Sequence, residues 1–154
     1  MALAPVPHSG VAALLEAQLA KKPLGEVLDK FPSSPEVALA AWEETPDRAT
    51  RAHAMSLLGE HPDNPSLLLV AADLAAKEGD VTAVAELVGR GRWLAPWSVE
   101  FASLDFELAL AKHDCGAADL RFVEVTSLVG ERMSDGSRQW LEKARTRLSG
   151  CTAK

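Results

Sequence analysis

The chain has 154 residues and a formal net charge of −6, and 47% of its residues are hydrophobic. This hydrophobic fraction is too high for a disordered chain, and the length allows one domain with a substantial core. The negative charge argues against a nucleic-acid-binding protein, which would normally be basic. No apolar run approaches the roughly 20 residues that a membrane span needs. Composition therefore predicts one folded domain that binds neither nucleic acid nor a membrane.

The N-terminal segment indicates where the folded domain begins. Residues 1–8 include Pro5 and Pro7, and we expect them to form a loose tail ahead of the first helix. They lack the basic region and the apolar stretch of a secretory signal peptide. We therefore expect a cytoplasmic protein whose single folded domain covers residues 9–150.

A truncated first repeat is predicted over residues 9–32. It consists of a helix over about 9–21 and a shorter helix over 23–31. Apolar residues recur at helical spacing in both segments, which predicts that the two helices pack against each other. The residues that set the faces of the first helix are Val11, Leu14, Leu15, Gln18 and Leu19.

The second repeat is predicted over residues 33–62. Ser33 is the expected N-cap, and Glu36 follows three residues later, as in a capping box. The turn at residues 45–47 leads into a second helix that runs through Leu58. The pattern again predicts two helices joined by a short turn.

The third repeat, residues 63–96, has the clearest signals. Asn64 is a good N-cap because its side-chain oxygen can accept a hydrogen bond from a free amide of the first turn, and Pro65 suits the first helical position. Gly79 is expected to end this helix, and Asp80 is expected to cap the next one. This stretch predicts a helix, a tight turn and a second helix.

The fourth repeat, residues 97–133, begins with Ser98 as the expected N-cap. Its first helix is apolar on two sides, which predicts that it lies between two neighbours and is the best-buried helix. Its second helix is expected to end near Arg132. One of the two apolar stripes of the first helix consists of Trp97, Phe101, Leu104, Leu108 and Ala111.

A C-terminal capping helix is predicted over residues 134–149. Repeat proteins need such a helix to close the open end of the core. Its basic outer face is either simply solvated or docks on an acidic partner or an anionic lipid. The residues expected to face inward are Trp140, Leu141, Ala144 and Leu148, and those expected to face outward are Arg138, Lys143, Arg145 and Arg147.

Prolines close helices at nearly regular intervals, at Pro32, Pro62 and Pro96. The third repeat carries the residues Leu68, Ala72, Gly79, Asp80, Gly91 and Pro96. In chain order these are a bulky residue, a small residue, a Gly-Asp turn, a second small residue and a proline that closes the repeat. This pattern resembles the tetratricopeptide repeat (TPR) family. Ala75 and Val88 stand where that family usually has aromatic residues. The resemblance implies an all-α fold, a TPR-like solenoid of antiparallel helix pairs with a C-terminal capping helix.

The densest cluster of chemically active side chains is His113, Asp114 and Cys115. A metal site would need a further converging ligand, and no metal-binding spacing is present. A Cys–His nucleophile pair would need side chains that face each other, whereas these residues are adjacent in a turn. We therefore interpret the cluster as turn-capping residues.

Residues 89–92, Gly-Arg-Gly-Arg, could suggest phosphate binding. Gly-rich phosphate loops precede a helix N-terminus, where amides point at the anion, but these residues lie at a helix end. There, arginine complements the helix dipole and glycine allows two helices to cross closely, and we favour this structural interpretation. The chain also has no enzyme motif, so we expect neither catalysis nor a metal or cofactor.

The leading hypothesis for function is a protein–protein interaction adaptor or scaffold. In the family that the chain resembles, the first helix of each pair lines a concave groove that holds a peptide or a helix of a partner. An acidic and apolar groove favours a basic or amphipathic partner. The residues expected to face the groove are Leu69, Asp73, Ala76, Lys77, Asp105 and Lys112.

A structural or self-associating module is the alternative hypothesis. In that case two chains form a homodimer, or the groove is filled by the chain's own N-terminal tail, and there is no separate peptide ligand. A stable dimer without a partner would favour this alternative.

The two cysteines, Cys115 and Cys151, are expected at the same end of the molecule. The helix after Cys115 carries the chain away by roughly 24 Å, at 1.5 Å per residue, and an antiparallel last helix brings it back. A reducing cytosol would keep both thiols free. We therefore expect two free thiols in the cell that a mild oxidant could join.

Overall fold

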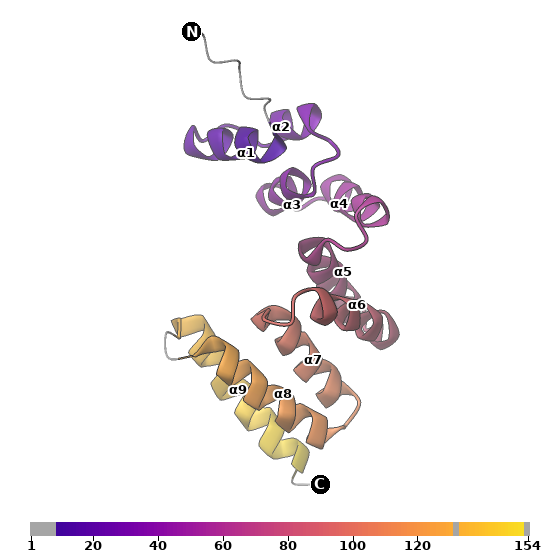
Figure 1. Cartoon of the computed structure of the whole chain (residues 1–154), viewed down its shortest axis with the longest axis vertical. Helices are drawn as coiled ribbons and strands as arrows, with labels where there is room; N and C mark the ends of the chain where they lie inside the picture. The colour runs from indigo at the N-terminus through magenta and orange to yellow at the C-terminus, as the bar shows by residue number, and fades with distance from the viewer. Residues whose placement is uncertain (1–8, 131–132, 153–154) are drawn as a thin grey trace. The chain divides into compact units, whose positions relative to one another are not determined.

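A computed structural model describes residues 9–130 and 133–152 of the chain. These residues form nine helices and no strand, which confirms the all-α class (Figure 1). The tail predicted at residues 1–8 lies outside the described residues, as does the predicted helix end at Arg132. The helices are α1 (Gly10–Leu19), α2 (Gly25–Lys30), α3 (Pro35–Glu44), α4 (Arg48–Glu60), α5 (Pro65–Glu78), α6 (Val81–Leu94), α7 (Val99–Ala111), α8 (Cys115–Val129) and α9 (Asp135–Thr152).

Side-chain caps explain where most of these helices begin. A helix leaves its first amides without a backbone partner, and a polar side chain just before the helix can accept a hydrogen bond from one of them. Residues in this role are Ser9, Ser34, Asp47, Asn64, Asp80, Ser98 and Asp114. The caps predicted at Asn64, Asp80 and Ser98 are thereby confirmed.

The cap predicted at Ser33 is wrong. Ser34 takes this role, and its Oγ accepts a hydrogen bond from the amide of Val37 at 3.5 Å. The reason is that Pro35 occupies the first helical position, so the residue directly before it is the N-cap. Glu36 then lies at the second helical position, where it accepts a hydrogen bond from the Ser34 hydroxyl at 2.9 Å.

The turns between the paired helices repeat one backbone design. Gly79 and His113 each have a positive φ, of 76° and 56° respectively, and each is followed by the aspartate that caps the next helix. The aspartate amides donate to the carbonyls of Ala75 and Ala109, in each case at 2.9 Å. The chain therefore repeats its local structure at these two turns.

The chain divides into two compact units, Met1–Leu67 and Leu68–Lys154. In the first unit, α1, α2 and α3 enclose one core around Leu14, Val27 and Val37. A second core of this unit joins α3, α4 and the start of α5, and its buried residues are Ala38, Ala54, Leu57 and Leu67.

Helix α1 is less buried than its pattern predicts. Leu14 and Ala17 enter the core, as one face of the helix packs against α2 and α3. Val11, Leu15 and Leu19 are exposed, and Leu19 is 86% exposed. Their i, i+4 and i+8 spacing places them together on the other face of the helix.

In the second unit, α7 lies between α6 and α8 (Figure 1). Its Phe101 and Phe106 are the largest fully buried side chains of the described residues. Phe106 also contacts the rings of Phe122 and Trp140, with centroids 6.3 and 5.4 Å away. The inward residues predicted for α9 are correct, because Leu141, Ala144 and Leu148 are buried and Trp140 packs against the same cores.

Of the apolar stripe predicted on α7, only Phe101 is fully buried, while Leu104 is partly buried and Ala111 is exposed. Trp97 is 71% exposed because it precedes the N-cap Ser98 and does not continue the helical stripe. Leu108 is only partly buried because it borders a cavity, which the next subsection describes. On α8, Leu120 is 67% exposed.

A close contact between α6 and α7 depends on Gly91. A Cβ atom at this position would overlap the ring of Phe101, which is only 1% exposed. The glycine therefore allows the ring to lie directly on the α6 backbone. This contact confirms the expectation that a small residue here permits close helix crossing.

Replacing Gly91 with alanine is expected to lower the free energy of unfolding by about 1–3 kcal/mol, because the buried Phe101 ring must move. Urea denaturation followed by circular dichroism measures this change. Gly89→Ala is the matched control on the same helix, since no atom lies within 4 Å of its added Cβ. The control is expected to be neutral or to stabilise by up to ~1 kcal/mol. Equal stability of the two variants would contradict the proposed contact.

Candidate functional site

A cavity of about 440 Å³ lies in the second unit between α5, the start of α6, α7 and α9. We call it the α5–α7 cavity. Helical spacing produces its α7 wall, because Leu104, Leu108 and Ala111 recur at i, i+4 and i+7 on one face. Its lining residues are Asp73, Ala76, Gly79, Val81, Val84, Leu104, Glu107, Leu108, Leu110, Ala111 and Arg147.

The lining combines apolar side chains with three charged ones. Val84 is buried and packs with Leu104 and Leu108, which are partly buried. The charged side chains of Asp73, Glu107 and Arg147 are more exposed. The cavity thus offers apolar surface next to two carboxylates and one guanidinium group.

Each carboxylate at the cavity has a nearby cation. Glu107 Oε2 lies 2.6 Å from Arg147 Nη1, which joins α7 to α9. Asp73 Oδ2 lies 2.6 Å from Lys77 Nζ one turn later on α5. Because these side chains are half-exposed, such pairs contribute little to stability, and a ligand could replace either cation. Both carboxylates are therefore accessible for binding.

The cavity brings together only some of the residues expected in a groove. Asp73 and Ala76 line it, and Lys77 adjoins it through the ion pair with Asp73. Leu69 is half-buried on α5 and is not a lining residue. Lys112 is the exposed C-cap of α7, also away from the lining.

Asp105 belongs to a cluster of four charged side chains from α6, α7 and α8. Its Oδ2 lies 2.8 Å from Arg121 Nε and 3.4 Å from Arg92 Nη1. Glu124 accepts hydrogen bonds from Arg92 Nη2 at 2.6 Å and from Arg121 Nη1 at 2.9 Å. Asp105 is thus paired inside this cluster and is not part of the cavity lining.

The arginines determine the charge of Glu124. Burial alone would raise the pKa of its carboxyl group, but the hydrogen bonds and positive charges of Arg92 and Arg121 outweigh this effect. The pKa of Glu124 therefore lies below its ordinary value. The carboxylate is ionised at neutral pH and links α8 to α6.

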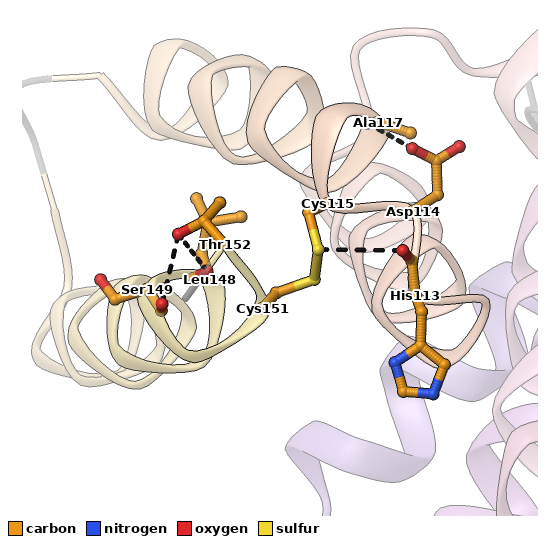
Figure 2. The surroundings of a disulfide bond; sticks show 8 residues. All are labelled: His113, Asp114, Cys115, Ala117, Leu148, Ser149, Cys151 and Thr152. Atoms are coloured by element: carbon orange, nitrogen blue, oxygen red, sulfur yellow. Dashed lines mark hydrogen bonds between the residues drawn. A yellow bond between two sulfur atoms is a disulfide. The ribbon is translucent and has the colours of Figure 1, made fainter. Parts of the chain in front are cut away.

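The turn at residues 113–115 has a structural role. Asp114 Oδ1 accepts a hydrogen bond from the amide of Ala117 at 3.0 Å, which confirms the interpretation as a turn-capping residue (Figure 2). Cys115 is joined to Cys151 by a disulfide, with the Cα atoms 5.7 Å apart. Over the described part of the chain, no three His, Cys, Asp or Glu side chains gather in a way that could hold a metal ion.

The disulfide links the start of α8 to the end of α9 (Figure 2). This placement confirms that the two cysteines lie at the same end of the α8–α9 pair. The expectation of free thiols in the cell concerns the compartment and stays a prediction. A second hollow, of about 600 Å³, borders the disulfide and is lined by Leu110, His113, Cys115, Arg147, Gly150 and Cys151.

Comparisons with known proteins identify no relative of this chain. Neither a protein-family profile, nor a curated protein, nor a solved structure matches the sequence. Separately, none of the helices that the structure describes has both the length and the apolar character that a membrane crossing requires.

Glu124→Gln tests the charge cluster through pH dependence. A group with a lowered pKa stabilises the fold above its unfolded pKa, and this contribution is lost as the pH falls through its folded pKa. At pH 7 the free energy of unfolding of the variant is expected to be about 1–2 kcal/mol lower than that of the parent. This difference should shrink as the pH falls below about 4.5, where the unfolded carboxyl becomes protonated.

Urea denaturation at pH 7 and at pH 3 measures the difference. Glu86→Gln is a matched control, because Glu86 lies on the exposed face of α6. We expect this control to change stability at pH 7 by less than about 0.5 kcal/mol. A Glu124→Gln effect that is the same at both pH values would show that the charge of Glu124 does not stabilise the fold.

Proposed function

We propose that this chain is a TPR-like helical-repeat protein that acts as an adaptor, binding a peptide or a helix of a partner protein. The observation that carries this proposal is the α5–α7 cavity, whose 440 Å³ is within the range of ligand pockets. Apolar surface beside carboxylates suits a peptide with apolar and basic side chains. The proposal includes no catalysis and no cofactor.

The repetition of local structure supports the TPR-like part of the proposal. The turns at Gly79 and His113 share one hydrogen-bond pattern. Their separation along the chain matches the length of one tetratricopeptide repeat, which is about 34 residues. The first helices of these two pairs, α5 and α7, supply most of the cavity lining. We propose that such pairs stack into a solenoid closed by α9.

The expected partner is basic or amphipathic. Asp73 and Glu107 carry two negative charges at the cavity, and Arg147 carries one positive charge. A lysine or arginine of the ligand can take the place of Lys77 or Arg147 beside these carboxylates. Leu104 and Leu108 then bury an apolar side chain of the same ligand, which stabilises the complex by the hydrophobic effect. We keep the cytoplasm as the proposed location.

Self-association is the second candidate function, and the exposed tryptophans favour it. Trp93, in the last turn of α6, is 84% exposed, and Trp97, in the connection from α6 to α7, is 71% exposed. Large aromatic side chains are enriched in protein interfaces, where they often contribute much of the binding energy. Light scattering during size-exclusion chromatography distinguishes a stable dimer from a monomer.

Selection of ligands from a displayed library of random peptides tests the adaptor function. The full chain serves as bait, and affinities of the selected peptides are measured by fluorescence anisotropy. We expect selected peptides to combine basic and apolar residues. Asp73→Lys should weaken their binding by roughly tenfold, which corresponds to ~1.4 kcal/mol for the loss of one charge contact.

Asp119→Lys is the matched control for this charge change, because Asp119 is exposed on α8 and is not a lining residue. It should leave peptide affinity unchanged, and circular dichroism should show that both variants keep the parent's helical signal. Failure to enrich any peptide, or equal weakening by both substitutions, would rule out the proposed site.

A further inference from the structure

The end of α9 depends on the disulfide for its position. Leu141, Ala144 and Leu148 are buried against α7 and α8, but Ser149, Gly150 and Thr152 are exposed. Gly150 is also a poor helix former, and the last turn of a helix leaves carbonyl groups without backbone partners. Within the described residues, the disulfide is thus the main tertiary attachment of this turn.

Arg147 connects this turn to the α5–α7 cavity. It lies one turn before Cys151, so both residues project from the same face of α9. Arg147 lines both the cavity and the hollow beside the disulfide, and it pairs with Glu107 at 2.6 Å. Because this ion pair is half-exposed, it is too weak to hold the helix end alone. Arg147 and both cysteines line the same hollow, so an ordered last turn of α9 limits where the Arg147 side chain can move.

We propose that the Cys115–Cys151 disulfide is a redox switch for the α5–α7 cavity. When the bond is present, the last turn of α9 is fixed and Arg147 neutralises Glu107. When the bond is reduced, the last turn frays and Arg147 leaves the cavity. The carboxylates of Asp73 and Glu107 then remain, and the cavity binds a basic ligand more tightly. This inference rests on the proposed peptide-binding function for its biological meaning.

The chemistry requires a dithiol reductant that can reach the sulfur atoms. Both cysteines are partly exposed and border the hollow of about 600 Å³. A thiolate of the reductant attacks one sulfur and forms a mixed disulfide, and its second thiol then displaces that cysteine. The reductant loses two electrons and becomes a disulfide, while Cys115 and Cys151 each gain a proton. A disulfide oxidant reverses the exchange.

Hydrogen exchange and arginine modification of the full chain test the switch. Dithiothreitol is the reductant, and phenylglyoxal, which modifies free guanidinium groups, is the probe of Arg147. We expect amides in residues 149–152 to exchange roughly tenfold faster after reduction, a loss of ~1.4 kcal/mol in local stability. Modification of Arg147 should also accelerate, whereas that of Arg138 at the other end of α9 should not change.

Cys115→Ser should behave like the reduced protein both with and without dithiothreitol. Equal exchange and equal Arg147 modification in the oxidised and reduced states would overturn the switch. A collapse of the helical dichroism on reduction would also overturn it, since the bond would then hold the whole second unit together.

Peptide binding separates this inference from the proposed function. If selected peptides bind the oxidised and reduced proteins equally, the switch is wrong and the adaptor function stands. If Arg147 responds to reduction but no peptide is selected, the redox coupling stands and the adaptor function is wrong. Tighter binding of a basic peptide by the reduced protein supports both.

Discussion

The contact of Phe101 with the backbone at Gly91 is the constraint on which the second unit depends. It sets how closely α6 and α7 approach, because any larger residue than glycine would separate them. Arg92 follows Gly91 directly, so the same contact brings its guanidinium group to Asp105 and Glu124. The burial of an aromatic ring and the charge cluster thus both depend on a glycine, which has no side chain, at residue 91.

The charge cluster gives α6, α7 and α8 a defined rotation about their axes. Apolar residues alone allow several similar packings, since one aliphatic side chain can often replace another. Asp105 and Glu124 each form ion pairs with both arginines, and a rotation of any helix would leave a partly buried charge unpaired. With α7 fixed in this way, its Leu104 and Leu108 are held in the wall of the cavity.

The sequence predicts the helices well because their ends are determined locally. Asn64, Asp80 and Ser98 cap helices through residues only three positions away, so the signal lies within one short stretch. The error between Ser33 and Ser34 is one of choosing between two adjacent caps. Asp105 could not be assigned from the sequence, because its partners lie on two other helices, α6 and α8. The cavity could not be predicted from the sequence for the same reason, since it depends on how α5, α7 and α9 are rotated and spaced.

The four tryptophans differ in their surroundings, and this difference affects how the protein can be observed. Trp93 and Trp97 are in water in the folded chain, so their fluorescence changes little on unfolding. Trp42 packs against the core of the first unit, and Trp140 packs against the cores around α7 and α8 in the second. Each unit therefore contains one partly buried tryptophan whose emission reports on its own melting. Intrinsic fluorescence can follow the two units separately once the other tryptophans are replaced by phenylalanine.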